Sequence, residues 1–194
     1  VCRNAANDEI IRRYYQSMNR FVHDEATKEE IYKQELLMQQ AKITVNDRPV
    51  VPVAKDKAKA TENPAAALEL PDGTIITGKT TDLLGATSAA LLNAVKTLGG
   101  IADSVHLISP YYIEPIQDLK TRHLGSKNPR LHTDEVLVAL SVLSTQDEDC
   151  RHALEVLPQL EGCQMHSTVM LNEVDRKIFR KLGVGLTCDP NRKR

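Results

Sequence analysis

The sequence predicts an α/β fold, a layered sandwich with a mixed sheet, preceded by an N-terminal helical pair. Three observations predict it. Apolar residues recur at spacings of three and four over residues 8–22, the pattern of an amphipathic helix. A proline–glycine turn at residues 71–73 joins two apolar runs into a β-hairpin. From Ala65 onward strands alternate with helices, so some strands are expected to pair in parallel.

The N-terminal helical pair is predicted within residues 1–41. Its first helix spans residues 8–22. The second begins at Thr27, where Thr27 and Glu30 form a capping-box pattern, and runs to about Ala41. Two helices cannot bury an apolar face alone, so we expect this pair to dock on the rest of the protein or on a second copy. The pair is rich in aromatic residues, namely Tyr14, Tyr15, Phe21 and Tyr32.

Residues 42–64 are predicted to be a connector between the helical pair and the α/β domain. Prolines punctuate this stretch, and its Lys/Ala-rich middle, residues 54–61, favours a short exposed helix. The α/β domain is then expected over residues 65–190.

The α/β domain is predicted to begin with the hairpin, whose strands span residues 66–70 and 74–78. A helix over residues 82–98 follows, with Thr81 or Asp82 as its N-cap and two glycines at its end. The remaining predicted elements are a buried strand over 105–108, helices over 113–124, 133–143 and 147–157, a strand over 163–171, a helix over 173–182 and a last strand over 184–188.

The composition excludes several classes of protein. The chain has 194 residues, 41% hydrophobic and 26% charged, with a formal net charge of -1. No apolar run approaches the roughly 20 residues that a membrane-spanning helix needs. Nucleic-acid-binding domains are usually strongly basic, so the balanced charge argues against that partner. We therefore expect one large domain with an appendage, and neither a membrane nor a nucleic-acid partner.

The cysteines indicate a reducing compartment. Cys2, Cys150, Cys163 and Cys188 are far apart and form no C-x-x-C pair, so their spacing gives no zinc signature. The start of the chain is polar and charged, unlike a signal peptide. We expect a cytoplasmic protein with reduced thiols, no metal ion and no cofactor. Because the chain begins at Val1 rather than at methionine, we also expect a fragment.

Residues 73–80 match the phosphate-loop pattern G-x-x-x-x-G-K-[ST] letter for letter. A working phosphate loop follows a buried strand and bends so that its backbone N–H groups surround phosphate oxygens. Here a proline turn precedes Gly73, and the four middle residues are all β-branched, which favours an extended conformation. We therefore interpret the match as a strand leaving the hairpin.

A weaker anion site is predicted at Lys79, Thr80 and Thr81, where the strand leads into the helix over residues 82–98. Helix N-termini attract anions through their free N–H groups and the helix dipole. A lysine beside two hydroxyls suits a phosphate or a carboxylate. The alternative is a capped helix with a solvated lysine.

The polar loop over residues 125–132 is the second candidate, because loops concentrate binding groups. We expect it to share one ligand with residues 79–81 if both lie at one edge of the sheet, where ligands bind in open α/β folds. The alternative is an ordinary polar connection capped by Thr133. If a reaction follows, His132 is the best proton carrier, since imidazole titrates near neutrality. The candidate ligand-binding residues of this loop are Ser126, Lys127, Asn128, Arg130 and His132.

A third candidate, in the strand over residues 163–171, is weaker. Side chains alternate between the two faces of a strand, so Cys163 and Ser167 share one face and His166 takes the other. This argues against a catalytic pair within the segment and favours a structural histidine.

Five blocks of the chain carry a resemblance: Glu9–Tyr15, Leu70–Ala86, Ile108–Gln117, Leu124–Glu135 and His166–Val169. They resemble the C-terminal part of a bacterial family of unknown function. The resemblance implies that a larger N-terminal portion of the same protein is missing here and is a partner of this domain. Some members carry the label ATP-dependent peptidase, and the letter match at residues 73–80 is one source of such labels. The sequence contains neither an H-E-x-x-H pair nor a nucleophile motif.

The leading functional hypothesis is a C-terminal α/β domain that binds an anionic small molecule bearing a phosphate or a carboxylate. The alternative is a non-catalytic module that assembles a homo-oligomer through the N-terminal helices and the helix over residues 82–98. The small residues that would permit close approach of that helix are Ala86, Ala89, Ala90 and Ala94. An ATP-dependent peptidase is the least favoured function, because it needs a real phosphate loop.

Overall fold

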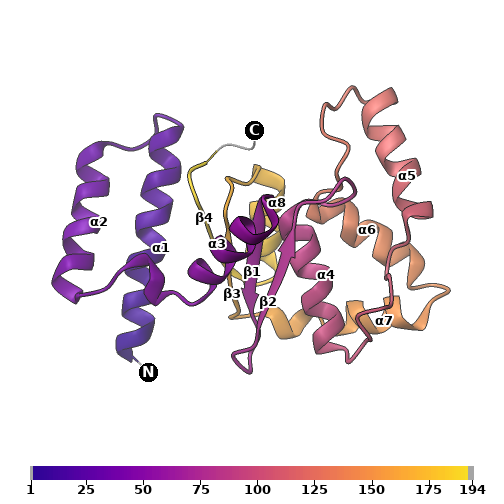
Figure 1. Cartoon of the computed structure of the whole chain (residues 1–194), viewed down its shortest axis with the longest axis horizontal. Helices are drawn as coiled ribbons and strands as arrows, with labels where there is room; N and C mark the ends of the chain where they lie inside the picture. Colours follow the sequence, from indigo (N-terminus) through magenta and orange to yellow (C-terminus); the bar gives the residue numbers. More distant parts are fainter. Residues whose placement is uncertain (1, 192–194) are drawn as a thin grey trace.

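The computed structural model describes residues 2–191, except for the side chains of residues 2–4, and confirms the α/β fold (Figure 1). The helices are α1 (Cys2–Val22), α2 (Lys28–Ala41), α3 (Val50–Thr61), α4 (Ala86–Leu98), α5 (Pro110–Asp118), α6 (Thr133–Leu143), α7 (Glu148–Glu155) and α8 (Glu173–Lys181). The short turns are η1 (Val45–Asp47), the π-helical η2 (Leu119–His123) and η3 (Leu157–Leu160). The strands are β1 (Ala65–Glu69), β2 (Ile75–Lys79), β3 (Gln164–Ser167) and β4 (Gly185–Cys188).

The four strands form one mixed sheet in the order β2-β1-β3-β4. Strand β1 is antiparallel to both β2 and β3, while β3 and β4 are parallel. Its residue Ala67 pairs with Thr77 on one side and His166 on the other. The predicted hairpin and the last strand are therefore confirmed. The strand predicted over residues 163–171 is present as β3 but ends at Ser167, and β4 is an edge strand.

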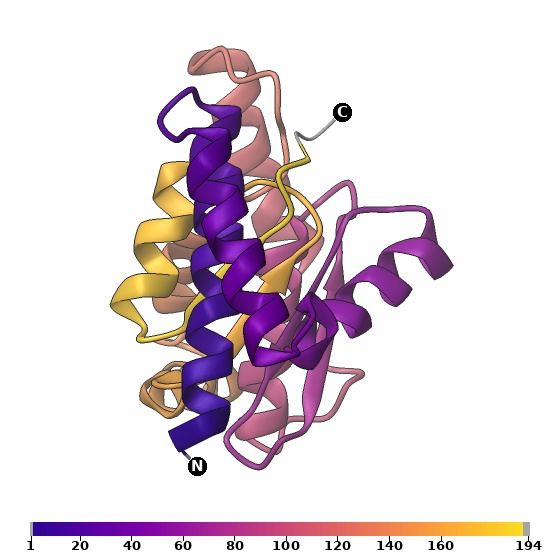
Figure 2. The same cartoon turned by 90° about the vertical axis from the view of Figure 1, so that its left-hand side faces the viewer.

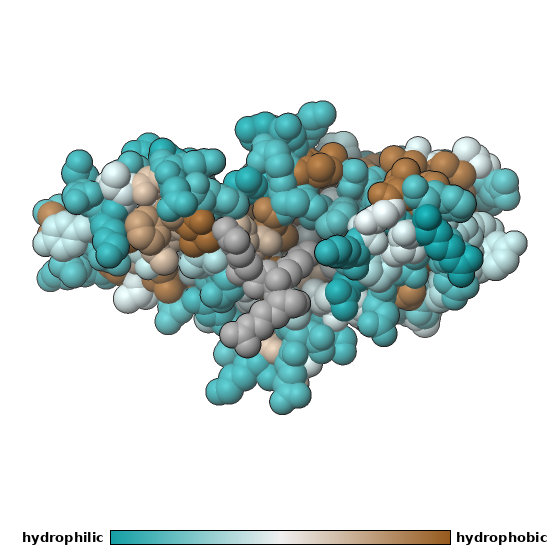
Figure 3. Space-filling view, turned by 90° about the horizontal axis from the view of Figure 1, so that it is seen from above, coloured by the Kyte–Doolittle hydropathy of each residue, from teal (hydrophilic) through white to brown (hydrophobic). Residues whose placement is uncertain are grey.

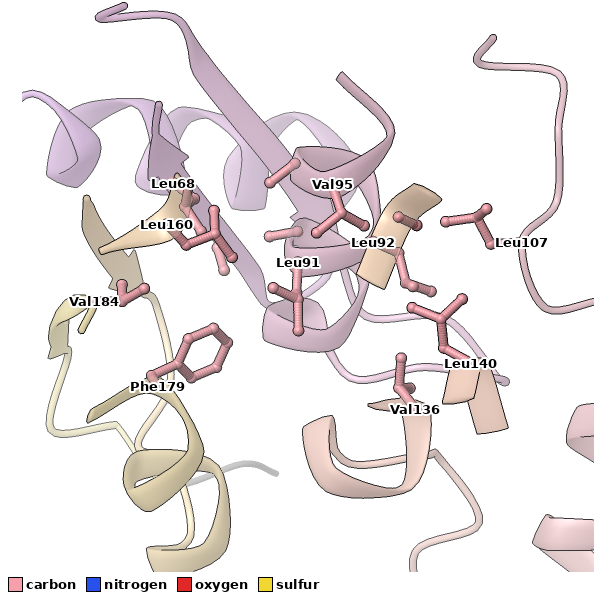
Figure 4. Close-up of a cluster of buried hydrophobic side chains, with 14 of the residues drawn as sticks. Leu68, Leu91, Leu92, Val95, Leu107, Val136, Leu140, Leu160, Phe179 and Val184 are labelled. Carbon is pink, nitrogen blue, oxygen red and sulfur yellow. The ribbon is translucent and has the colours of Figure 1, made fainter. Parts of the chain in front are cut away.

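Helices cover both faces of the sheet (Figures 1 and 2). On one face, Val50 and Ala54 of α3 bury against Ala67 of β1. Helices α4, α6, α7 and α8 contribute to the larger core on the opposite face, where Leu68 of β1 lies. Figure 4 shows Leu91 of α4 in this core, together with residues from α6 and α8. Strand β1 is therefore apolar on both faces.

The helix predicted over residues 54–61 of the connector is present, and its residues after Ala54 are exposed or half-buried, but it begins earlier, at Val50, with a buried first turn. Helix α3 buries Val50, Val51 and Ala54 completely, because its apolar first turns lie against the sheet. Val51 also contacts Ile11 of α1, which docks the helical pair on the rest of the chain. The domain boundaries after residues 41 and 64 stay predictions.

The predicted strand over residues 105–108 is also wrong. This segment has no strand conformation, although Leu107 and Ile108 are each only 5% exposed. Their side chains enter the core, and the Leu107 carbonyl accepts a hydrogen bond from Cys150 Sγ at 3.1 Å. A short apolar run can thus be buried by side-chain packing without a neighbouring strand.

Helix α4 begins at Ala86, later than predicted, and its N-cap is Gly85 rather than residue 81 or 82. The Thr81 hydroxyl instead accepts hydrogen bonds from the backbone of residues 83 and 84, at 3.3 and 3.1 Å. Leu84 then forms a parallel bridge with Leu131. The bridge holds residues 81–85 out of the helix.

A buried arginine ties α1 to the sheet. The Arg48 side chain is fully buried and forms an ion pair with Asp8 of α1. Its guanidinium also donates to the Gly185 carbonyl of β4 and, at 3.5 Å, to the Met165 carbonyl of β3. No helix within residues 2–191 is both long and apolar enough to span a membrane.

Candidate functional site

Residues 73–80 form a hairpin turn and a strand, as interpreted from the sequence. Gly73 has a φ of +86°, which the turn requires. Gly78 lies in β2 directly against α4: a Cβ atom at Gly78 would overlap the Ala90 amide nitrogen and lie 2.7 Å from the Ala86 carbonyl oxygen. Both glycines of the letter match therefore serve the fold.

Lys79, Thr80 and Thr81 do not lie at a helix N-terminus, because α4 begins only at Ala86. Lys79 is the exposed last residue of β2, and Thr81 is exposed after it. Thr80 is buried, and its N–H donates to the Pro64 carbonyl at 2.7 Å. The dipole of α4 therefore does not attract an anion to these three residues.

The structure nevertheless brings the two predicted walls together. Arg130 Nε donates to the Thr81 carbonyl at 2.6 Å. The Leu131 N–H donates to the Leu83 carbonyl at 2.9 Å, and the Gly85 N–H donates to the Leu131 carbonyl at 3.3 Å. Residues 79–85 and the loop over 125–132 are thus neighbours.

Several polar groups of this loop bind one another. Ser126 Oγ donates to the Asn128 carbonyl at 3.1 Å, and Asn128 Oδ1 accepts from the Arg130 N–H at 3.2 Å. The buried Lys120 Nζ donates to the Arg130 carbonyl at 2.6 Å and to Glu135 at 2.7 Å. These bonds stabilise the loop's own conformation. Lys127 is exposed on the same loop.

His132 is held by Asp175, a residue of α8 that the sequence did not point to. His132 Nδ1 lies 3.2 Å from the Asp175 carboxylate, and Nε2 lies 3.4 Å from the Asn128 amide nitrogen. Burial would raise the pKa of Asp175, but hydrogen bonds from His132 and from the Thr133 backbone N–H lower it overall. The ionised carboxylate therefore fixes the orientation of the imidazole.

A second histidine, His166, is completely buried between the sheet and α1. Its Nδ1 lies 2.9 Å from the Thr187 hydroxyl, and its Nε2 lies 3.5 Å from the Asp189 carboxylate. The Tyr15 ring packs on it, with 4.9 Å between ring centroids. Burial lowers the pKa of His166, against the effect of Asp189, so this ring stays neutral at pH 7.

The structure contains a cleft that sequence reasoning missed. It lies between α1 and α8, with β4 as its floor, and has a volume of about 420 Å³. Figure 2 shows α8 beside α1, with β4 passing behind α1. The lining residues are Arg12, Tyr15, Gln16, Asn19, Arg20, Glu173, Arg176, Lys177, Arg180 and Val184–Cys188.

The walls of this cleft carry five cationic side chains and one carboxylate, that of Glu173. Four of the cations are paired. Arg12 pairs with Glu9 at 2.7 Å and Arg20 with Glu30 at 3.3 Å, while Arg176 and Lys177 share Glu173 at 2.7 and 4.0 Å. The hydrogen bond from Arg12 is the largest cause that lowers the pKa of Glu9 to about 2. Arg180 forms no ion pair with any residue that the structure describes. The cleft therefore has more cationic than anionic side chains and retains one guanidinium, that of Arg180, without a carboxylate partner among the described residues.

Helical periodicity places these cations on the cleft. Arg176 and Arg180 are four residues apart and share one face of α8, while Phe179 is buried on another. On α1, Arg12 and Gln16 share the same spacing. Each basic stripe is visible in the sequence, but nothing local shows that the two helices face each other. Within the side chains described, no three His, Cys, Asp or Glu residues gather closely enough to hold a metal ion.

The chain is similar to bacterial proteins along nearly all of its length. Residues 46–194 match the C-terminal domain of unknown function DUF1846. A UPF0371 protein of Corynebacterium aurimucosum is 54% identical over 190 residues, which are 98% of this chain and 38% of that protein. A UPF0371 protein of Streptococcus sanguinis is 48% identical over 186 residues, 96% of this chain and 38% of that protein. The chain thus spans 38% of the length of these relatives.

Proposed function

Because the chain belongs to the family of the DUF1846 C-terminal domain, a domain of unknown function, we propose a function from the site itself: it binds an anionic small molecule in the cleft between α1 and α8. The charge of the cleft carries this proposal. Five cations face one carboxylate in a volume of about 420 Å³, within the usual range of ligand pockets.

The chemistry of the walls fits phosphates and carboxylates. A guanidinium binds either group through two parallel N–H···O bonds. A cleft lined by one sign of charge also concentrates counter-ions and accelerates their binding. Arg180 is available for such a contact, while Arg176 would exchange Glu173 for the ligand.

We keep the residues predicted from the sequence as a second proposed anion site. These are Lys79, Thr80, Thr81, Ser126, Lys127, Asn128, Arg130 and His132, and the contact between Arg130 and Thr81 supports their grouping. A cytoplasmic location is part of the same proposal, supported by the free, buried thiols of Cys150, Cys163 and Cys188. The remainder of a longer protein is the proposed partner, since the relatives are much longer than this chain.

The double variant Arg176→Ala/Arg180→Ala is expected to weaken anion binding by tenfold or more, because it removes one basic wall of the cleft. The probes are pyrophosphate and citrate, titrated at low salt and followed by thermal unfolding. At 100 times its dissociation constant a ligand adds about 2.7 kcal/mol of stability. Lys181→Ala, on the same helix but outside the cleft, is the matched control and should bind like the parent chain.

A parallel double variant, Lys79→Ala/Arg130→Ala, separates the two proposed sites. Loss of binding in this variant alone would assign the anion site to the loops around residues 79–81 and 125–132. If neither anion stabilises the parent chain, anion binding by this domain is wrong. If the parent binds and both double variants bind as tightly, both proposed sites are wrong.

Self-association is the second candidate function, favoured by an apolar groove of about 320 Å³ between α5 and α6. Val138 and Val142 of α6 line it and are 64% and 65% exposed. Figure 3 shows hydrophobic surface at the right-hand end of the molecule, where α5 lies. Exposed patches of this kind often mark interaction sites. The interface predicted on the helix over residues 82–98 is not free, because its small residues Ala86, Ala90 and Ala94 are buried in the core.

Sedimentation velocity at micromolar concentration tests this second candidate. The parent chain is expected to dimerise through the α5–α6 groove, and Val138→Asp is expected to make it monomeric by placing a charge in the apolar contact. Ser141→Asp, exposed on the same helix but outside the groove, controls for added charge and should not change the assembly. A monomeric parent chain would contradict the proposal.

A further inference from the structure

We propose that the anion bound between α1 and α8 is peptide-like: a short extended chain with acidic side chains, whose backbone pairs with the edge of β4. This inference rests on the proposed function, because it names the class of anion that the cleft takes. It draws on three features of the cleft: its floor, an amide already bound there, and the placement of its cations.

The floor of the cleft is the outer edge of the sheet. Strand β4 has β3 on one side and no strand on the other. The N–H groups of Gly185 and Asp189 donate toward β3, to the carbonyls of Cys163 and Ser167, at 2.8 and 2.9 Å. Backbone direction alternates along a strand, so the groups of Leu186 and Cys188 point away from β3. Such an edge is a template for another extended chain.

A side-chain amide already uses this edge. Asn19 Nδ2 donates to the Cys188 carbonyl at 2.8 Å and to the Tyr15 carbonyl of α1 at 2.7 Å. Asn19 thus occupies the position that the N–H of a further strand would take at Cys188. Two residues earlier, Leu186 lines the cleft with its outward N–H and carbonyl. These two groups are the available pairing positions for a ligand amide.

The cations lie where an added strand would direct its side chains. Successive side chains of a strand point to opposite faces of the sheet. Helix α1 lies on the face of Ala67 and His166, since Tyr15 packs on His166. Helix α8 lies on the other face, where Phe179 joins the core of Leu68. Successive acidic side chains would therefore reach Arg12 and Arg20 on one wall and Arg176 and Arg180 on the other.

The cationic side chains of the cleft favour an acidic peptide over a basic or a neutral one. Main-chain hydrogen bonds give affinity in this mode of recognition, and the flanking pockets select the side chains. A basic chain would meet five like charges, and a neutral chain would leave Arg180 without a carboxylate partner among the described residues. The volume of about 420 Å³ limits the ligand to a few residues.

Calorimetric titration of the chain with four probes tests the proposal. The probes are acetyl-Glu-Glu-Glu-amide, the same peptide with N-methylated backbone nitrogens, acetyl-Gln-Gln-Gln-amide, and citrate as a tricarboxylate without a peptide backbone. We expect the first peptide to bind at least tenfold more tightly than citrate. N-methylation should remove that advantage, and the glutamine peptide should bind at least tenfold more weakly than the glutamate peptide.

Two outcomes separate this inference from the proposed function. If citrate and both glutamate peptides bind equally, pairing with β4 is wrong while the anionic cleft stands. If none of the three anions binds and pyrophosphate does not bind either, the proposed function itself fails. Equal binding of the glutamine and glutamate peptides would overturn the charge argument.

The variant Leu186→Pro tests the edge directly. Proline is tolerated on an edge strand where its missing N–H faces outward, as that of Leu186 does. We expect this substitution to weaken peptide binding about tenfold more than citrate binding. Should the variant not fold, hydrogen exchange of the Leu186 amide in the parent chain provides the answer: it should slow with the glutamate peptide and not with citrate. Unchanged exchange would overturn the proposal.

Discussion

Gly78→Ala is expected to destabilise the chain by about 3 kcal/mol, or to prevent folding, because the new Cβ atom has no space. The obstacle is the backbone of α4, at Ala86 and Ala90, and not the end of a flexible side chain. Relief requires α4 to move away from β2, which would open the core beneath it. The cost therefore lies at the upper end of overpacking effects.

Urea unfolding followed by circular dichroism measures this loss. Lys79→Ala is the matched control, because Lys79 is the exposed next residue of the same strand. Its effect should stay within about 0.5 kcal/mol. A phosphate-loop glycine would give the opposite pattern, with stability retained and anion binding lost. Equal stability of Gly78→Ala and the parent chain would contradict the packing of α4 on β2.

Asp8→Asn is expected to cost about 3 kcal/mol of stability, because it leaves the Arg48 charge without its carboxylate. The Arg48 side chain is 0% exposed, whereas Asp8 retains 25% of its exposure, so the loss lies at the low end of the range for broken buried pairs. The remaining partners of Arg48 are carbonyls of Gly185 and Met165, which do not neutralise it.

A double-mutant cycle with Arg48→Met distinguishes the cost of a stranded charge from the net contribution of the pair. The double variant should be more stable than Asp8→Asn alone, because no charge remains buried. Urea unfolding of all four proteins gives the coupling free energy. Additive effects of the two substitutions would show that the ion pair does not stabilise the attachment of α1.

The sequence predicts elements whose signals are local. The Thr27 hydroxyl accepts from the Glu30 N–H at 3.3 Å and begins α2 where the capping pattern predicted. The predicted start of α4 is wrong. The Leu84–Leu131 bridge joins residues 47 positions apart, and it keeps Thr81 from acting as the N-cap that the sequence predicts. The prediction of a strand over residues 105–108 is wrong for a similar reason, because Leu107 and Ile108 are buried by tertiary packing.

The candidate site likewise depends on contacts between residues that are distant in the sequence. The pairing of His132 with Asp175, and the facing of Arg12 and Arg180, join residues far apart in the chain. The helical spacing of the basic residues can be seen in the sequence of each helix. The cleft, however, forms only because the fold places α1 and α8 on either side of β4. Ligands bind at one edge of an open α/β sheet, and this rule predicts that Arg130 and Thr81 are neighbours. The hydrogen bond from Arg130 Nε to the Thr81 carbonyl shows that they are.

The order of strands also bears on how the protein is made. Strand β1 is synthesised long before its neighbour β3, and α1 reaches Cys188 through a bond that spans 169 residues. A nascent chain that ends before β3 holds a two-stranded hairpin only, which is marginally stable by itself. The chain therefore leaves the ribosome with an incomplete sheet, and non-local pairing of this kind slows folding. During that interval the edge of β1 that later pairs with β3 remains open to aggregation and to chaperones.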